Sequence, residues 1–176
     1  MTDRTTEDSR AVVLGGFEEL WLHRKPETAD KWFTPDLTFQ TTIQPEPFRG
    51  PAGFREFYSG ISGGFPDYDI HVDEIVAEGS KVVLRFTFRG TNTGDYFGIP
   101  STGKPVTIRF VEIFTVRGDQ IAEIWHVANV LDVMQQLGFL PKSGLPKPVM
   151  WMYKLRSKIR QRRAGAAGSA QPAQPS

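Results

Sequence analysis

The sequence predicts an α+β fold in which helices from the first part of the chain cover one face of an antiparallel sheet. Two observations lead to this prediction. Apolar residues recur at helical spacing in the first part of the chain, and three long runs rich in β-branched and aromatic residues follow in succession. With 176 residues, of which 39% are hydrophobic and 12% aromatic, the chain is long enough for one sizeable core.

Three helices are expected before the long strands. Residues Arg10 to Arg24 place apolar side chains at helical spacing and predict the first helix. A short second helix is expected after Pro26, because proline favours a helix start, and it should end near Phe33. Residues 51–62 again show apolar side chains three and four residues apart and predict a third helix, closed by two glycines.

The predicted sheet has one early strand and four later ones. Threonine and aromatic residues predict the early strand over residues 36–43, and a meander of strands follows over residues 68–77, 81–91, 105–116 and 120–127. The connection over residues 92–104 is long and glycine-rich, and loops of this kind often carry binding residues on a rigid scaffold. A short helix is expected after the last strand.

Charge divides the chain into two predicted parts, a domain over residues 1–140 and an extension over residues 141–176. Residues 1–138 carry a net charge of −7, whereas the remaining residues carry +8. An acidic domain argues against nucleic-acid binding, which needs a basic surface. Residues 148–163 combine an apolar helical stripe with basic residues, which suits docking to a membrane surface or to a protein, and the end of the extension should be disordered.

Composition also limits the chemistry. The chain has no cysteine and only three histidines, which lack the spacing of metal ligands, so no metal site is expected. The N-terminus lacks the pattern of a signal peptide, and there is no run of 18 apolar residues. A soluble cytoplasmic protein is therefore predicted.

Several motifs carry a resemblance to a known family. They are Gly64-Phe65-Pro66-Asp67, the segment GTNTGDYFGIPSTGK that begins at Gly90, and EIWHV followed by QQLG. Over roughly residues 8–140 the chain resembles the SnoaL-like polyketide cyclases, or ester cyclases, of the nuclear transport factor 2-like superfamily. The resemblance implies a cone-shaped curved antiparallel sheet, the cystatin-like α+β barrel, wrapped around N-terminal helices and an internal pocket. It also implies a homodimer that needs no cofactor and closes a ring in an apolar small-molecule substrate, as in antibiotic and other secondary metabolite biosynthesis.

The chain departs from this family at three positions. Members commonly have an aspartate after the tryptophan of EIWHV and again three residues later, whereas this chain has His126 and Asn129. Asn92 stands where many members have histidine. The carboxylate that the resemblance implies as acid and base is therefore missing from its expected place.

Glu112 and His126 form a candidate replacement, provided that the last hairpin has the right register. A three-residue loop that pairs Val116 with Gln120 would place Glu112 and His126 on one face as diagonal neighbours. A two-residue turn would instead send His126 to the other face. We favour the first register, because it gives a carboxylate on the apolar face a hydrogen-bonding partner.

In that register the carboxylate orients the imidazole, which removes a proton from the substrate in an intramolecular aldol or epoxide-opening closure. Hydrogen bonds to the developing negative charge would come from Asn129, Asn92 or Tyr96. Four aromatic residues are candidates for substrate contact, although such residues more often fill a core: Trp21, Trp32, Phe39 and Phe110. Loss of the usual aspartates leaves an alternative, a noncatalytic protein that binds a small molecule or acts as a scaffold.

Overall fold

The computed structural model describes residues 6–141. The chain divides into two units, Met1–Leu140 and Pro141–Ser176, and the fold described below is that of the first. The basic segment 148–163, for which membrane or protein docking is predicted, lies outside the described residues.

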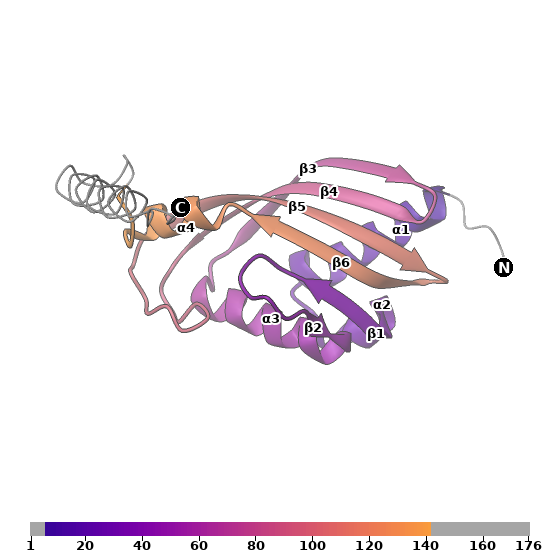
Figure 1. Ribbon diagram of the computed structural model, residues 1–176, viewed down its shortest axis with the longest axis horizontal. Helices are drawn as coiled ribbons and strands as arrows, with labels where there is room; N and C mark the ends of the chain where they lie inside the picture. Colours follow the sequence, from indigo (N-terminus) through magenta and orange to yellow (C-terminus); the bar gives the residue numbers. More distant parts are fainter. Residues whose placement is uncertain (1–5, 142–176) are drawn as a thin grey trace, which may run out of the picture. The chain divides into compact units, whose positions relative to one another are not determined.

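A six-stranded sheet forms the framework, in the order β2-β1-β6-β5-β4-β3 (Figure 1). Neighbouring strands from β3 to β6 are antiparallel, as the meander predicts. The strands are β1 (Phe33–Gln40), β2 (Phe48–Arg49), β3 (Asp69–Glu78), β4 (Lys81–Thr91), β5 (Pro105–Arg117) and β6 (Gln120–Ala128).

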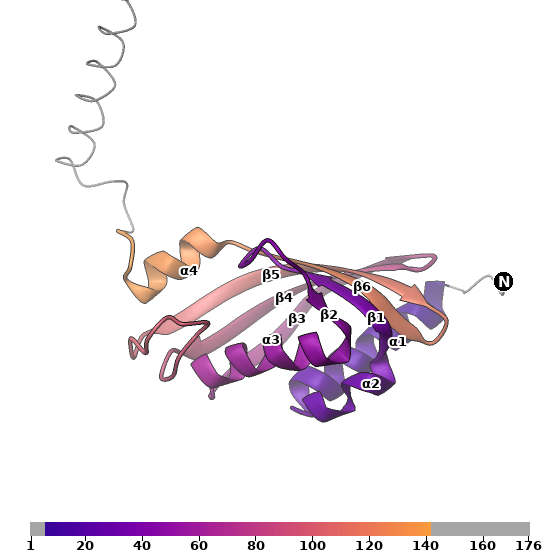
Figure 2. The ribbon, with the colours of Figure 1, turned by 60° about the horizontal axis from the view of Figure 1, so that its bottom comes forward.

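Helices cover the concave face of this curved sheet, so the predicted α+β fold is confirmed (Figure 2). The helical elements are α1 (Thr6–Phe17), a π-helical segment η1 (Glu18–Leu22), a 3₁₀ segment η2 (Pro26–Thr28), α2 (Ala29–Trp32), α3 (Gly50–Gly64) and α4 (Val130–Leu137). None of the helices within residues 6–141 is long and apolar enough to cross a membrane.

The sheet is mixed, which corrects the expectation of a purely antiparallel one. Strand β1 lies parallel to β6, with Phe39 opposite Ile124, and antiparallel to the two-residue β2. Strand β1 also begins at Phe33, before Pro35. Proline lacks a donor for a sheet hydrogen bond, but β2 reaches only Thr38 and Phe39, so that side of Pro35 has no neighbouring strand.

The first helix changes its winding where the pocket begins. The expected helix over residues 10–24 is instead α1 followed by the π-helical turn Glu18–Leu22. A π-turn accommodates one extra residue and is frequent at functional sites. Here both Leu20 and Trp21 are buried, and the Tyr68 hydroxyl donates a hydrogen bond of 2.9 Å to the Trp21 backbone oxygen.

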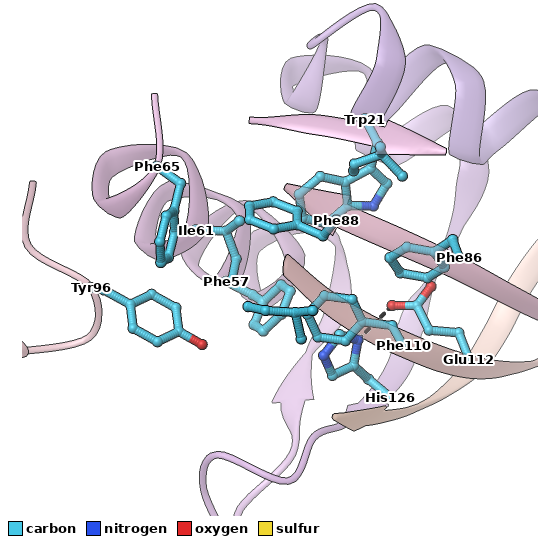
Figure 3. A pocket seen from close by; sticks show the side chains of 12 residues that line it. Trp21, Phe57, Ile61, Phe65, Phe86, Phe88, Tyr96, Phe110, Glu112 and His126 are labelled. Atoms are coloured by element: carbon cyan, nitrogen blue, oxygen red, sulfur yellow. Dashed lines mark hydrogen bonds and ion pairs between the residues drawn. The ribbon is translucent and has the colours of Figure 1, made fainter. Parts of the chain in front are cut away.

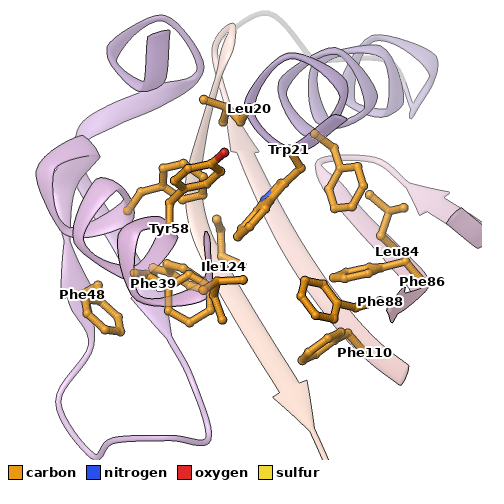
Figure 4. Close-up of a cluster of buried hydrophobic side chains, with 14 of the residues drawn as sticks. Leu20, Trp21, Phe39, Phe48, Tyr58, Leu84, Phe86, Phe88, Phe110 and Ile124 are labelled. Carbon is orange, nitrogen blue, oxygen red and sulfur yellow. The ribbon is translucent and has the colours of Figure 1, made fainter. Parts of the chain in front are cut away.

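Aromatic rings fill the space between the helices and the sheet (Figure 4). Trp21 packs edge-on against Phe54 and Phe57 of α3, with centroid distances of 5.7 and 6.3 Å. Phe86 of β4 stacks on Phe110 of β5 at 5.2 Å. Burial of such large apolar surfaces is the main term that holds the helices on the sheet.

One side chain of helix α4 hydrogen-bonds to the backbone of β5, while Val133 and Leu137 pack into the core. Oε1 of Gln136 accepts a hydrogen bond of 2.8 Å from the Thr107 backbone N–H, and Nε2 of Gln136 donates one of 2.9 Å to the Thr107 oxygen. The helix begins after Asn129, whose side-chain oxygen accepts a hydrogen bond from the Asp132 N–H, and ends at Gly138 in a left-handed conformation. These contacts fix α4 beside the sheet.

Candidate active site in the pocket

The hairpin between β5 and β6 has a tighter turn than expected. Gly118 and Asp119 form a two-residue turn between the paired residues Arg117 and Gln120. Gly118 has a φ of 61°, which glycine adopts without steric cost at the first central position of such a turn. The expected three-residue loop that pairs Val116 with Gln120 is therefore wrong.

A β-bulge beyond the turn nevertheless brings the two polar side chains together. The register shifts between Thr115 and Val116, where Ala122 is an extra residue on β6. Without this shift, a two-residue turn would place His126 on the face opposite to Glu112. With it, the two residues are direct partners across the strands rather than diagonal neighbours.

Glu112 and His126 form a hydrogen-bonded pair inside an aromatic environment (Figure 3). Nδ1 of His126 lies 2.7 Å from Oε1 of Glu112, and both side chains are buried. The rings of Phe39, Phe57 and Phe110 surround the imidazole, with centroid distances of 6.0, 5.4 and 4.7 Å. Because an unpaired buried carboxylate is very costly, the imidazole explains how Glu112 is tolerated on this face.

The pair leaves one ring nitrogen of His126 available. An ionised carboxylate only accepts hydrogen bonds, so Nδ1–H donates to Glu112, and in the neutral imidazole Nε2 then carries the lone pair. Nε2 makes no hydrogen bond to any residue within 6–141, and in Figure 3 it points away from Glu112 into the pocket. The arrangement is that of a general base oriented by a carboxylate.

His126 lies between two adjoining cavities, which we call the inner and the outer chamber of the pocket. We call the five residues that line both chambers the waist: Phe57, Ile61, Tyr96, Phe110 and His126. The inner chamber has a free volume of about 20 Å³, room for about one water molecule. The outer chamber has a free volume of about 180 Å³, so a bound molecule has most of its space there.

The two chambers differ in their other walls. Trp21, Phe65, Phe86 and Phe88 add aromatic rings to the inner chamber. The outer chamber is mainly aliphatic, and its remaining walls come from the segment after β1, the loop after β4, the end of β6 and helix α4: Thr42, Ile43, Phe97, Ile99, Ala128, Val130, Val133 and Met134. Glu112 and His126 are the only charged or titratable groups in either lining besides the Tyr96 hydroxyl.

Asn92 organises the glycine-rich loop rather than facing the pocket. Its side-chain nitrogen donates to the backbone oxygens of Gly64 and Gly94, at 3.3 and 2.9 Å. Its side-chain oxygen accepts hydrogen bonds from the Thr102 N–H and hydroxyl, at 2.9 and 3.0 Å. Both donor hydrogens are therefore used, and Asn92 is fully buried. These contacts give a structural role to the asparagine and to the STG part of the loop motif.

The loop also rests closely on the end of α3. A Cβ atom at Gly64 would lie 2.8 Å from the Cβ of Tyr96, and one at Gly60 would lie 2.4 Å from the Phe97 ring. Neither position has room for a side chain. Asp67 accepts a hydrogen bond of 2.7 Å from the Thr91 N–H, and this bond lowers the pKa of Asp67. The Gly64-to-Asp67 motif thus supports the loop that carries Tyr96.

The remaining candidates lie at different places. Trp21 and Phe110 line the pocket, whereas Phe39 packs against the His126 ring but lines neither chamber. Trp32 lies outside both chambers, and its Nε1 donates a hydrogen bond of 2.9 Å to Glu19. Asn129 is exposed at the start of α4, where it caps the helix. The structure therefore brings His126, Glu112, Tyr96, Phe110 and Trp21 together and leaves the other four outside the linings.

Sequence reasoning missed the part of the pocket that α3 and α4 provide. Phe57 and Ile61 lie four residues apart on α3 and share one face, and that spacing predicts the helix without indicating that its apolar face lines a pocket. Val133 and Met134 belong to the apolar side of α4. Among residues 6–141, no three His, Asp or Glu side chains lie close enough together to hold a metal ion.

The family model for SnoaL-like polyketide cyclases matches residues 11–137 of the chain. That range includes both chambers and the Glu112–His126 pair. No curated protein matches the chain.

Solved structures show the same fold. A provisionally named SnoaL-like polyketide cyclase from Jannaschia sp. CCS1 is 23% identical, covers 80% of this chain and 100% of its own, and superposes with a TM-score of 0.71. AclR from Streptomyces galilaeus, provisionally named a hydroxylase, is 25% identical over 90% of this chain and 98% of its own, with a TM-score of 0.66. IdmH from Streptomyces antibioticus, provisionally named a polyketide cyclase, is 25% identical over 77% of this chain and 99% of its own, with a TM-score of 0.61.

Proposed function

The chain belongs to the SnoaL-like polyketide cyclase family, and from that premise we propose that it closes a ring in a polyketide-type substrate by acid–base catalysis at the waist of its pocket. The observation that carries the proposal is the buried pair of Glu112 and His126, with a free Nε2 facing the cavity. His126 would take the role of the carboxylate that is usual in the family.

In the proposed reaction, Nε2 of His126 removes a proton from a carbon activated by neighbouring carbonyl groups. Glu112 holds the imidazole in the required tautomer and stabilises the imidazolium that forms. The carbanion attacks a carbonyl carbon elsewhere in the same molecule, and the confined pocket favours the folded conformation in which the two carbons meet. For a hydroxy-epoxide, the same base would activate the hydroxyl that opens the epoxide ring.

The proposed substrate is an uncharged and largely apolar molecule, processed by a cytoplasmic enzyme of secondary metabolism. No lysine or arginine lines either chamber, so an anionic group would be desolvated there without a partner. The side chains supply the base, and the proton removed from carbon equals the proton that the new hydroxyl requires. The proposal therefore needs no cofactor.

The test is turnover of linear poly-β-keto esters and hydroxy-epoxides by the wild type and by His126→Gln, followed by mass spectrometry and chromatography. Glutamine fills a similar space and hydrogen-bonds to Glu112 but is not a base. We expect cyclised product from the wild type and a loss of about 10²- to 10⁴-fold in the variant. His71→Gln on β3 is the matched control, because His71 is exposed and lines neither chamber.

Equal turnover by the wild type and His126→Gln would remove His126 from the mechanism. Saturable binding of these compounds without any product would favour the alternative, a noncatalytic protein that binds a small molecule in the same pocket. That alternative is motivated by the residues that replace the two usual aspartates, His126 and Asn129.

A further inference from the structure

We propose that Tyr96 is a second catalytic residue, which donates a hydrogen bond to the substrate oxygen on which negative charge develops while His126 acts as the base. The inference rests on the proposed acid–base function and adds the electrophilic half of the site. It concerns the carbonyl group that is attacked, whereas the Glu112–His126 pair acts on the carbon that loses a proton.

Tyr96 lines the same part of the pocket as His126. Tyr96 and His126 are the two polar side chains of the waist, so each reaches both chambers. The Tyr96 side chain comes from the loop after β4, and in Figure 3 its hydroxyl points into the pocket toward the side of His126. A substrate that occupies the waist would therefore have the base and the hydroxyl within the same small space.

The hydroxyl of Tyr96 is also available to donate a hydrogen bond. Tyr96 is only 8% exposed, yet its hydroxyl makes no hydrogen bond to another residue in the described part of the chain. The hydroxyls of Tyr58 and Tyr68 bond to each other in the core at 3.0 Å, whereas the Tyr96 oxygen is not fully enclosed by protein atoms and stays open to the cavity. The free hydroxyl of Tyr96 is thus a donor that a ligand oxygen in the waist would satisfy.

The Tyr96 ring is held rigidly by its neighbours. This matters because a donor contributes most when it is already in place before the charge develops. Tyr96 and Ile99 exchange two backbone hydrogen bonds of 2.9 Å. The ring packs edge-on against Phe65 at a centroid distance of 5.2 Å, and Gly64 lies directly beneath its Cβ. The phenol is held at a fixed point of the wall.

The alternative donors are not directed into the pocket. Both side-chain N–H groups of Asn92 bond to backbone oxygens in the loop, and Asn129 is an exposed helix cap that lines neither chamber. Tyr96 is the one member of the three with a hydroxyl or amide directed into the pocket.

With Tyr96 as the donor, the proton transfers of the proposed reaction balance. Burial raises the pKa of Tyr96 to about 12, so the phenol keeps its proton at neutral pH. As the carbon–carbon bond forms, the carbonyl π electrons move to oxygen, which takes the Tyr96 proton; the tyrosinate is reprotonated from the His126 imidazolium through water in the outer chamber. One C–H bond is lost and one O–H bond is gained, with both residues restored.

The test uses Tyr96→Phe and a substrate-independent probe, a neutral aryl ketone with a ¹³C-labelled carbonyl such as 2-acetylnaphthalene. Isotope-edited infrared spectroscopy of the bound ketone reports hydrogen-bond donation as a lower C=O stretching frequency. We expect the frequency to be lower in the wild type than in Tyr96→Phe. In the cyclisation assay we expect kcat to fall on the order of 10²-fold in the variant, with little change in KM.

Tyr58→Phe is the matched control, because it also deletes a buried hydroxyl but lines neither chamber. It should lower the melting temperature and leave the carbonyl frequency unchanged. No saturable binding of the ketone, or one frequency in both the wild type and Tyr96→Phe, would overturn the role of Tyr96.

The two proposals fail separately. A frequency shift that depends on Tyr96, without cyclisation by any variant, would support the donor and overturn the cyclase. Cyclisation that depends on His126 but is unaffected by Tyr96→Phe would do the reverse.

Discussion

On the inner face of the β5–β6 hairpin, Glu112 and His126 are 3% and 5% exposed, whereas on its outer face the neighbouring residues Ile113 and Trp125 are 41% and 59% exposed. An antiparallel sheet with one solvated face normally shows the opposite arrangement, with apolar side chains inside and polar ones outside. These neighbouring rungs therefore invert the usual polarity, although the other inward-facing residues of the two strands, such as Phe110, Phe114 and Ile124, are buried and apolar.

This inversion suggests that neither face is arranged for the stability of one isolated subunit. A buried, hydrogen-bonded pair of polar side chains is weak evidence for stability, since replacing both partners by apolar residues is often neutral or favourable. Clustered exposed apolar residues usually mark a surface that something covers; here Val111, Ile113, Trp125 and Val127 form such a cluster. We propose a bound substrate as the reason for the buried polar pair, and the outer cluster favours the predicted homodimer.

The largest effect expected from the comparison is on turnover. Glu112→Gln preserves shape and a hydrogen bond to His126, but it removes the charge that stabilises the imidazolium, so kcat should fall about 10²- to 10⁴-fold. Ile113→Val, one residue away on the outer face, should leave kcat unchanged. The measurement is steady-state kinetics with poly-β-keto esters as substrates. An unchanged kcat in Glu112→Gln would show that the inner face is not catalytic.

A second prediction concerns stability, measured by urea unfolding. Glu112→Ala leaves the buried imidazole N–H without a partner and should cost about 1–3 kcal/mol. The double variant Glu112→Leu/His126→Phe should recover most of that loss, because no polar group then remains unpaired. A double variant as unstable as the single one would mean that the pair itself stabilises the fold.

The outer face is tested through the oligomeric state. We expect Trp125→Lys to convert a dimer into a monomer by light scattering after size-exclusion chromatography, because it places a charge in the centre of the apolar cluster. Leu22→Lys, at an exposed position in η1, should remain dimeric. If the wild type is itself monomeric, the homodimer prediction fails.

The smallest effect is expected for the charged residue beside that cluster. The Thr115 hydroxyl bond, followed by Lys81, lowers the pKa of Glu123 below its ordinary value of 4.5. Its contribution is therefore present above about pH 4.5 and is lost as the pH falls through the lowered value. Glu123→Gln should cost at most about 0.5 kcal/mol at pH 7, and urea unfolding below the lowered pKa should show no difference; a constant difference at all pH values would contradict this cause.

Local patterns in the sequence predicted the helices and the antiparallel strands well. The range expected for β4 is the one observed, and α3 is extended by only a few residues. Period and turn residues are local signals, and both elements follow them. The parallel pairing of β1 with β6 joins segments far apart in the chain, and no local pattern encodes it.

The candidate site shows the same division. Glu112 and His126 could be selected because a polar residue on an apolar strand face requires a partner. The bulge at Ala122 was not predictable, since one extra residue leaves no distinct pattern among apolar neighbours. The π-helical turn at Trp21 and the saturated hydrogen bonds of Asn92 likewise depend on contacts that only the folded chain brings together.

The glutamine on α4 has a further consequence. The last residue of β6 that pairs with β5 is Ala128, opposite Phe110, so β5 continues past the end of β6. Without a partner, the backbone of Thr107 would be an open sheet edge to which another chain could bind. The Gln136 amide offers Thr107 one acceptor and one donor, the same pair that a peptide group of an adjoining strand would offer. The Gln136 side chain thus prevents the strand of another chain from pairing at this edge. We expect that removing this side chain would reduce the solubility of the protein.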